Sequence, residues 1–122
     1  MTFSFPLPAD DARQFAAEWI AAWNSHDLSR ILSHYAPSVV LTSPVAARLS
    51  GSATVEGIDN LRSYFALGLE RFPRLHFDLI DVFTGYASLV LVYTNQTGTR
   101  TAEWMQFNEE SKVVRVAAQY SA

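Results

Sequence analysis

One acidic residue stands among large apolar side chains near the C-terminus, in the run Thr101-Ala102-Glu103-Trp104-Met105-Gln106-Phe107. A strand places every second residue on the same face, so Glu103, Met105 and Phe107 share one side. If that face is buried, desolvation raises the pKa of the Glu103 carboxyl group. Such a group can act as an acid or base near neutral pH, or hydrogen-bond to a carbonyl oxygen. The alternative for Glu103 is an exposed position at the rim of the sheet.

Two other polar residues, Asn95 and Gln119, allow more than one interpretation. Gln119, on the last predicted strand, either neighbours Glu103 or points outward. Asn95 follows an apolar strand, where a turn role is the more typical one.

Other kinds of catalytic centre have little support. His26, His34 and His76 do not show the repeated spacing that is typical of metal ligands. The chain has no cysteine, which excludes disulfides and thiolate chemistry. The sequence also lacks a Gly-x-Ser-x-Gly elbow, a phosphate-binding loop and a dinucleotide fingerprint. We therefore expect no metal and no cofactor.

Composition indicates one globular domain, residues 1–122, with residues 1–9 as an extended lead-in. Of the 122 residues, 49% are hydrophobic and 17% are charged, which is typical of a folded chain. The net charge of −3 gives no reason to expect a nucleic-acid partner. No apolar run approaches the roughly 20 residues that cross a bilayer, and the N-terminus does not resemble a signal peptide. These features favour a cytoplasmic protein without a membrane partner.

The apolar spacing predicts helices first and strands afterwards. A helix is expected from Asp10 or Asp11 to about Asn24, and a second one carries Leu28, Ile31, Leu32 and Tyr35 and ends at Pro37. A short edge strand (residues 38–45), a loop (46–56) and a third helix (57–72) follow. The last predicted elements are four strands at residues 75–83, 87–95, 100–107 and 112–120. This order is typical of the α+β class with an antiparallel sheet.

The parity of the strand that contains Glu103 also predicts a second interface. Trp104 points to the opposite face of the sheet, where a large aromatic side chain implies a covering surface. No helical layer remains to cover it, so we expect a homodimer through that outer face.

Three segments of the chain together resemble the SnoaL-like branch of the nuclear transport factor 2 superfamily, which includes ketosteroid isomerases, polyketide cyclases and dehydratases. The resemblance covers nearly the whole chain from Asp10. It implies a cone-shaped, curved antiparallel sheet packed on three N-terminal helices around an apolar pocket, and usually a homodimer. The matching segments are Trp19-x-x-x-Trp23-Asn24-Ser25-His26-Asp27-Leu28 with Tyr35-Ala36; Glu56-Gly57 with Leu61-x-x-Tyr64-Phe65; and Phe107-Asn108 with Lys112-Val113-Val114.

In ketosteroid isomerases an Asp moves the proton while a Tyr and a protonated Asp hold the oxyanion. The resemblance implies that Ser43, before Pro44, stands at the position of the proton-moving Asp, and Glu103 at that of the protonated Asp. A serine hydroxyl has no useful basicity near neutral pH, so Glu103 would act as base in its place or as a neutral donor. The oxyanion Tyr falls at or near Trp19, and supporting tyrosines fall at Tyr35 and Tyr64.

Two functional hypotheses follow. The first is an isomerase, cyclase or dehydratase acting on a small, apolar carbonyl compound, with Glu103 as acid–base group or oxyanion donor. The second is a non-catalytic homodimeric module that binds a hydrophobic metabolite. The first hypothesis predicts a catalytic set of Glu103, Tyr35 and Ser43, and a substrate-binding set of Trp19, Trp23, Tyr64, Phe65, Met105, Phe107 and Gln119.

Overall fold

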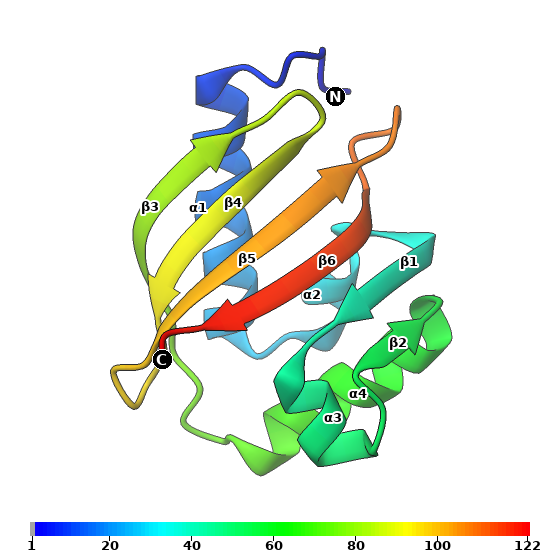
Figure 1. Ribbon diagram of the computed structural model, residues 1–122, viewed down its shortest axis with the longest axis vertical. Coiled ribbons are helices and arrows are strands. Elements are labelled where there is room, and N and C mark those ends of the chain that lie inside the picture. The colour runs from blue at the N-terminus through cyan, green and yellow to red at the C-terminus, as the bar shows by residue number, and fades with distance from the viewer. Residues whose placement is uncertain (1) are drawn as a thin grey trace.

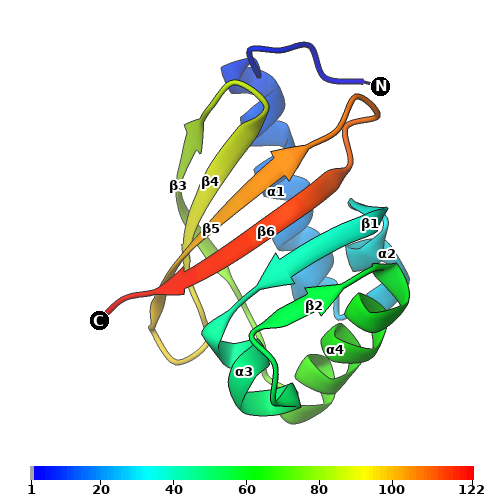
Figure 2. The same cartoon turned by 45° about the vertical axis from the view of Figure 1, so that its right-hand side comes forward.

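A computed structural model describes residues 2–122. Six strands form one sheet in the order β2-β1-β6-β5-β4-β3, with bounds β1 (Tyr35–Thr42), β2 (Thr54–Glu56), β3 (Asp78–Thr84), β4 (Ser88–Thr94), β5 (Arg100–Phe107) and β6 (Val113–Tyr120). The helices are α1 (Ala9–Ser25), α2 (Leu28–Leu32), α3 (Pro44–Ser50) and α4 (Ile58–Arg71). The sheet curves, α1 lies along its inner side, and α3 and α4 lie near β1 and β2 (Figures 1 and 2). The expected α+β class, with helices packed on a curved sheet, is confirmed.

Helix α1 follows the predicted stripe, since its buried residues recur at helical spacing and include Phe15, Trp19 and Trp23. It begins after Pro8 rather than at an aspartate cap, and Asp10 and Asp11 lie in its first turn, where carboxylates favour the helix dipole. The predicted lead-in of residues 1–9 includes Met1, which lies outside the described residues. Its later part is anchored to the sheet, because the Leu7 N–H donates to the Tyr86 carbonyl at 2.9 Å.

The segment between residues 28 and 56 differs from the sequence-based expectation. Helix α2 ends at Leu32, and Tyr35 opens β1 instead of lying on the helix. Tyr35 pairs with Val113, and this long-range pairing outweighs the local helical spacing. The expected loop at residues 46–56 contains α3 and β2, so there are four helices among the described residues rather than three. The β1–β6 pair is parallel, whereas the other strand pairs are antiparallel as predicted.

The two faces of β5 have the predicted parity. Thr101, Glu103, Met105 and Phe107 are buried, while the alternate residues Ala102, Trp104 and Gln106 are half-buried. The two ends of β5 lie in different parts of the core. Phe107 packs against Phe3 and Phe15 with ring centroids 5.1 and 4.9 Å apart, which fills one end of the core with aromatic rings.

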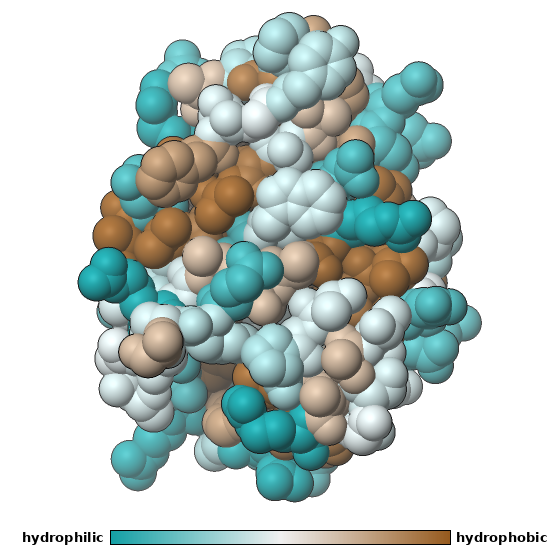
Figure 3. All heavy atoms as spheres, in the orientation of Figure 1, coloured by the Kyte–Doolittle hydropathy of each residue, from teal (hydrophilic) through white to brown (hydrophobic). Residues whose placement is uncertain are grey.

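The outer face of the sheet carries exposed apolar side chains. In the space-filling view of the side shown in Figure 1, apolar atoms gather over β3 and β4 (Figure 3). Ile80 and Phe83, on β3, are 53% and 56% exposed. No helix among residues 2–122 is long and apolar enough to cross a membrane.

Candidate functional site

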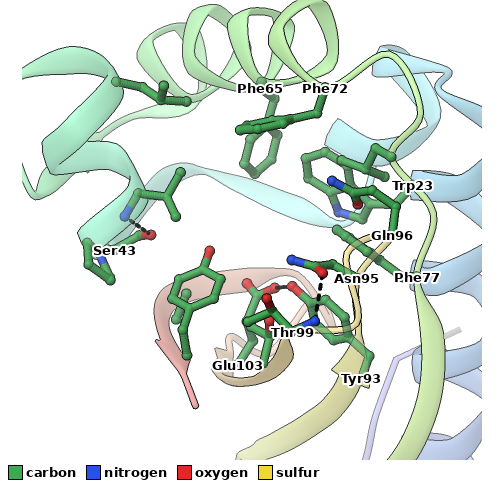
Figure 4. Close-up of a pocket in the computed structure, with 18 of the residues that line it drawn as sticks. Trp23, Ser43, Phe65, Phe72, Phe77, Tyr93, Asn95, Gln96, Thr99 and Glu103 are labelled. Carbon is green, nitrogen blue, oxygen red and sulfur yellow. Dashed lines mark hydrogen bonds between the residues drawn. The ribbon is translucent and has the colours of Figure 1, made fainter. Parts of the chain in front are cut away.

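A cavity of about 420 Å³ opens at the end of the core opposite the Phe3–Phe15–Phe107 cluster. Its walls come from α1, β1, α3, α4, the loop before β3, the β4–β5 turn and the adjoining ends of β4, β5 and β6. Figure 4 shows the aromatic rings of Trp23, Phe65, Phe72 and Phe77 on one side, with Glu103 across the space from them. The cavity is large enough for a small organic molecule.

Glu103 lies in the wall of this cavity and is only 7% exposed. Its Oε2 accepts a hydrogen bond from the hydroxyl group of Tyr93, which lies on the neighbouring strand. Burial raises the pKa of the Glu103 carboxyl group from 4.5 to about 7, and the Tyr93 hydrogen bond limits that rise. The carboxyl group is thus present in both protonation states near neutral pH.

Phenol groups surround this carboxyl group. Burial raises the pKa of Tyr93, Tyr64 and Tyr120, and the negative charge of Glu103 raises each further. All three rings line the cavity, so their hydroxyl groups remain protonated hydrogen-bond donors at neutral pH. Neither Tyr93 nor Tyr120 was singled out from the sequence. The alternation of Leu89, Leu91 and Tyr93 along β4 was the signal that could have found Tyr93.

Ser43 also lines the cavity and is only 3% exposed. Its Oγ accepts a hydrogen bond from the Val45 N–H at 3.1 Å and caps α3, with Pro44 at the first position of the helix. Ser43 therefore has a structural role in this position. Its own hydroxyl hydrogen can still be donated to a ligand.

Trp19 and Tyr35, which the sequence favours for substrate binding and catalysis, do not line the cavity. The Trp19 Nε1–H donates to the Tyr35 hydroxyl oxygen at 3.0 Å in a buried pair behind the wall. The Trp19 ring stacks on Phe77, which does line the cavity, with centroids 5.8 Å apart. The indole N–H is thus used within the protein, and the pair supports the wall rather than contacting the cavity.

Met105, Phe107 and Gln119 are likewise absent from the cavity wall. Phe107 lies four residues beyond Glu103 along β5, roughly 13 Å at the rise of a strand, and this distance carries it into the aromatic cluster at the other end. Met105 is fully buried between the two ends. Gln119 pairs with Ala102 on the outer face and is exposed, so it points outward.

Trp23, Tyr64 and Phe65, which the sequence favours for substrate binding, line the cavity. Trp23 packs edge-on against Phe65 with ring centroids 4.7 Å apart. Two buried polar atoms of the lining residues, Trp23 Nε1 and Thr101 Oγ1, have no hydrogen-bond partner among residues 2–122. Such atoms are uncommon in folded proteins, and a polar group of a bound molecule or a water molecule would supply the hydrogen bond that each of them lacks.

Polar side chains that follow Trp23 in the chain, in the run Asn24-Ser25-His26, hold the segment before β3 in place. The Asn24 side chain bonds both backbone groups of Phe77, accepting from its N–H at 2.8 Å and donating to its carbonyl at 2.9 Å. The His26 ring lies 2.8 Å from the Leu75 carbonyl oxygen. Because Leu75 and Phe77 line the cavity, these polar side chains at the end of α1 shape its wall.

Comparison with known proteins decides the family of this chain. A family model described as the SnoaL-like domain matches residues 16–120. The chain belongs to the SnoaL-like family. Among curated proteins, none matches it significantly.

Solved structures resemble this SnoaL-like chain closely. A SnoaL-like protein of unknown function from Burkholderia thailandensis is 33% identical, with a TM-score of 0.91 over 94% of this chain and 98% of the other. A Kribbella flavida protein proposed to be a ketosteroid isomerase is 12% identical, with a TM-score of 0.73 over 93% of this chain and 79% of the other. TerC, co-crystallised with polyporic acid, is 13% identical, with a TM-score of 0.75 over 90% and 91%. At these low identities, the Kribbella flavida protein and TerC show only that this chain has the same fold.

The SnoaL-like cavity contains no cluster of three or more His, Cys, Asp or Glu side chains that could hold a metal ion, within the part of the chain described here. The charged residues of its wall are Glu103 and Arg48. Arg48, on α3, was not singled out from the sequence, because its segment reads as a small, polar loop.

Proposed function

We propose that this SnoaL-like protein catalyses proton transfer at the carbon next to a carbonyl group, as in an isomerisation, cyclisation or dehydration of a small apolar compound. The observation that carries the proposal is the buried Glu103 carboxyl group, whose pKa is raised to about 7 in the wall of a largely aromatic cavity. A general base is most effective when its pKa lies near the working pH. The Kribbella flavida protein of the same fold, which is proposed to be a ketosteroid isomerase, is consistent with this class of reaction.

In an isomerisation the Glu103 carboxylate removes a proton from the carbon next to the carbonyl group and leaves an enolate. The protonated Glu103 then returns that proton to a carbon of the same molecule. Hydroxyl groups that line the cavity donate hydrogen bonds to the enolate oxygen, where negative charge develops. The candidates for this role are Ser43, Tyr64 and Tyr120.

An exchange experiment tests the proposal without knowledge of the natural substrate. 2-Acetonaphthone is an apolar ketone of suitable size, and exchange of its methyl protons in D₂O is followed by proton NMR. We expect the wild-type protein to accelerate exchange and the Glu103→Gln variant to lose about 10²–10⁴-fold of the acceleration. Exchange that is equally fast with Glu103→Gln would contradict the role of Glu103.

One observation favours the alternative of a non-catalytic binding module. Ser43, at the position where ketosteroid isomerases carry their proton-moving Asp, acts as the cap of α3. Binding of 2-acetonaphthone, detected by quenching of tryptophan fluorescence, without any acceleration of proton exchange would favour this second function.

We also propose that the protein forms a homodimer through the outer face of the sheet. Trp104, on β5, is half-buried, and Ile80 and Phe83, on the edge strand β3, are more than half exposed. A second copy of the same face would remove these apolar groups from water.

A further inference from the structure

The two charged residues of the cavity wall lie at different depths. Glu103 is buried, whereas Arg48 is exposed on α3 and therefore marks the mouth of the cavity. Arg48 forms no ion pair with any residue between 2 and 122. The mouth of the cavity thus carries a positive charge that no carboxylate of the described chain neutralises.

Hydroxyl groups stand beside this guanidinium group. Burial raises the pKa of Tyr64, and it raises that of Tyr120 to about 12, while the positive charge of Arg48 offsets part of each rise. Both tyrosines also lie near Ser43, and a hydrogen bond with the Ser43 side chain lowers the pKa of each phenol in part. One side of the cavity therefore combines a guanidinium group with three hydroxyl donors.

This combination of donors is suited to an anion. A guanidinium group offers a planar pair of N–H donors that match the two oxygens of a carboxylate. The opposite wall is aromatic, with Trp23, Phe65 and Phe77 lining it, and suits the body of an apolar molecule. A molecule that fits both walls has an apolar body and an anionic group at one end.

We propose that the substrate is an apolar keto acid, whose carboxylate binds Arg48 at the mouth while its carbonyl group lies near Glu103. The proposal rests on the proposed function, which places a carbonyl compound in the cavity, and adds the charge of the substrate and the residue that recognises it.

A matched pair of ligands tests the recognition of charge. 6-Acetyl-2-naphthoate and 2-acetonaphthone share the same ring and acetyl group, and only the first carries a carboxylate. Dissociation constants are measured by quenching of tryptophan fluorescence at pH 7 and low salt. The variants are Arg48→Gln and, as a matched control, Arg62→Gln on α4, whose partner is the exposed Asp59 and which does not line the cavity.

We expect the wild-type protein and Arg62→Gln to bind the keto acid about tenfold more tightly than the ketone, as a charge-assisted pair at a partly exposed site allows. Arg48→Gln should abolish this advantage while its affinity for the ketone changes less than twofold. Equal affinities of the wild-type protein for both ligands, or equal losses of both ligands in Arg48→Gln, would overturn the proposal while leaving the proposed function intact. A wild-type protein that binds neither ligand would overturn both.

Discussion

The properties of Glu103 arise from two opposing influences on one carboxyl group. Its removal from water favours the neutral form, and the hydrogen bond from Tyr93 favours the ionised form. Desolvation is the larger influence, so the pKa rises to about 7 rather than falling. The Tyr93 hydroxyl group therefore orients the carboxyl group and limits the rise of its pKa.

The raised pKa of Glu103 predicts a pH-dependent loss of stability. Below pH 4.5 the group is protonated in the folded and unfolded states, and between pH 4.5 and about 7 only the unfolded chain releases the proton. Stability therefore falls as pH rises through this window, by on the order of 3 kcal/mol in total. Urea unfolding of the wild-type protein and Glu103→Gln from pH 4 to 8.5 should show the variant gaining this relative stability. A pH-independent difference would contradict the prediction.

The burial of Glu103 could be predicted from the sequence, because the alternation of residues along β5 alone assigns each side chain to one face of the sheet. The alternation does not tell at which end of the core each buried side chain lies. Phe107 shares the face of Glu103 yet fills the other end of the core, and only the packing of Phe3 and Phe15 determines which end is closed. The hydrogen bond between Trp19 and Tyr35 could not be predicted from local patterns either, because the two residues lie on different elements.

The end of α1 shapes the cavity through polar contacts rather than through apolar packing. Phe77 lies just before β3 begins, and its backbone N–H and carbonyl groups bond the Asn24 side chain, as they would bond a neighbouring strand within a sheet. This explains why polar residues follow the apolar stripe of α1 directly: they attach the wall segment that contains Leu75 and Phe77.

Replacement of Asn24 by Ala should loosen this wall. The N–H and carbonyl groups of Phe77 lose their partners, which should lower the free energy of unfolding by about 1–3 kcal/mol and weaken binding of 2-acetonaphthone. Urea unfolding and fluorescence titration measure the two effects. Asn60→Ala, which removes one exposed bond to the Glu56 carbonyl, serves as the control and should change stability by about 0.5 kcal/mol or less. The same loss in both variants would contradict the special role of Asn24.

The elements that periodicity predicts well are those with long, regular apolar stripes, such as α1, α4 and the last strands. The elements missed are short. Helix α3 has seven residues, and its start depends on the Ser43 cap and Pro44, a combination that ends a strand as readily as it begins a helix. The parallel pairing of β1 with β6 joins segments far apart in the chain, which local patterns do not report.

At the scale of the whole molecule, the two faces of the sheet carry different features. The inner face builds the cavity with Glu103, and the outer face carries Trp104 on the same strand. A dimer through the outer face would therefore leave both cavities accessible, and the partner copy would pack against the outer face of β5.

Introduction of a positive charge on the outer face should separate the copies. We expect the wild-type protein to sediment at twice the chain mass and Trp104→Arg to sediment as a monomer, because a buried unpaired charge is costly. Ala66→Arg, which places the same charge at an exposed position of α4, should remain dimeric. A wild-type protein that is monomeric at high concentration would contradict the proposed dimer.

The protonation of Glu103 can be observed directly by carbon-13 NMR of protein labelled at the glutamate carboxyl carbon, with the resonance assigned by its absence in Glu103→Gln. We predict that this carbon titrates with a pKa of about 7 in the wild-type protein, and at a higher pH in Tyr93→Phe, which loses the hydrogen bond that favours the ionised form. A titration midpoint near the ordinary value of 4.5 would show a carboxyl group hydrated by bulk water, and it would contradict the account of this site.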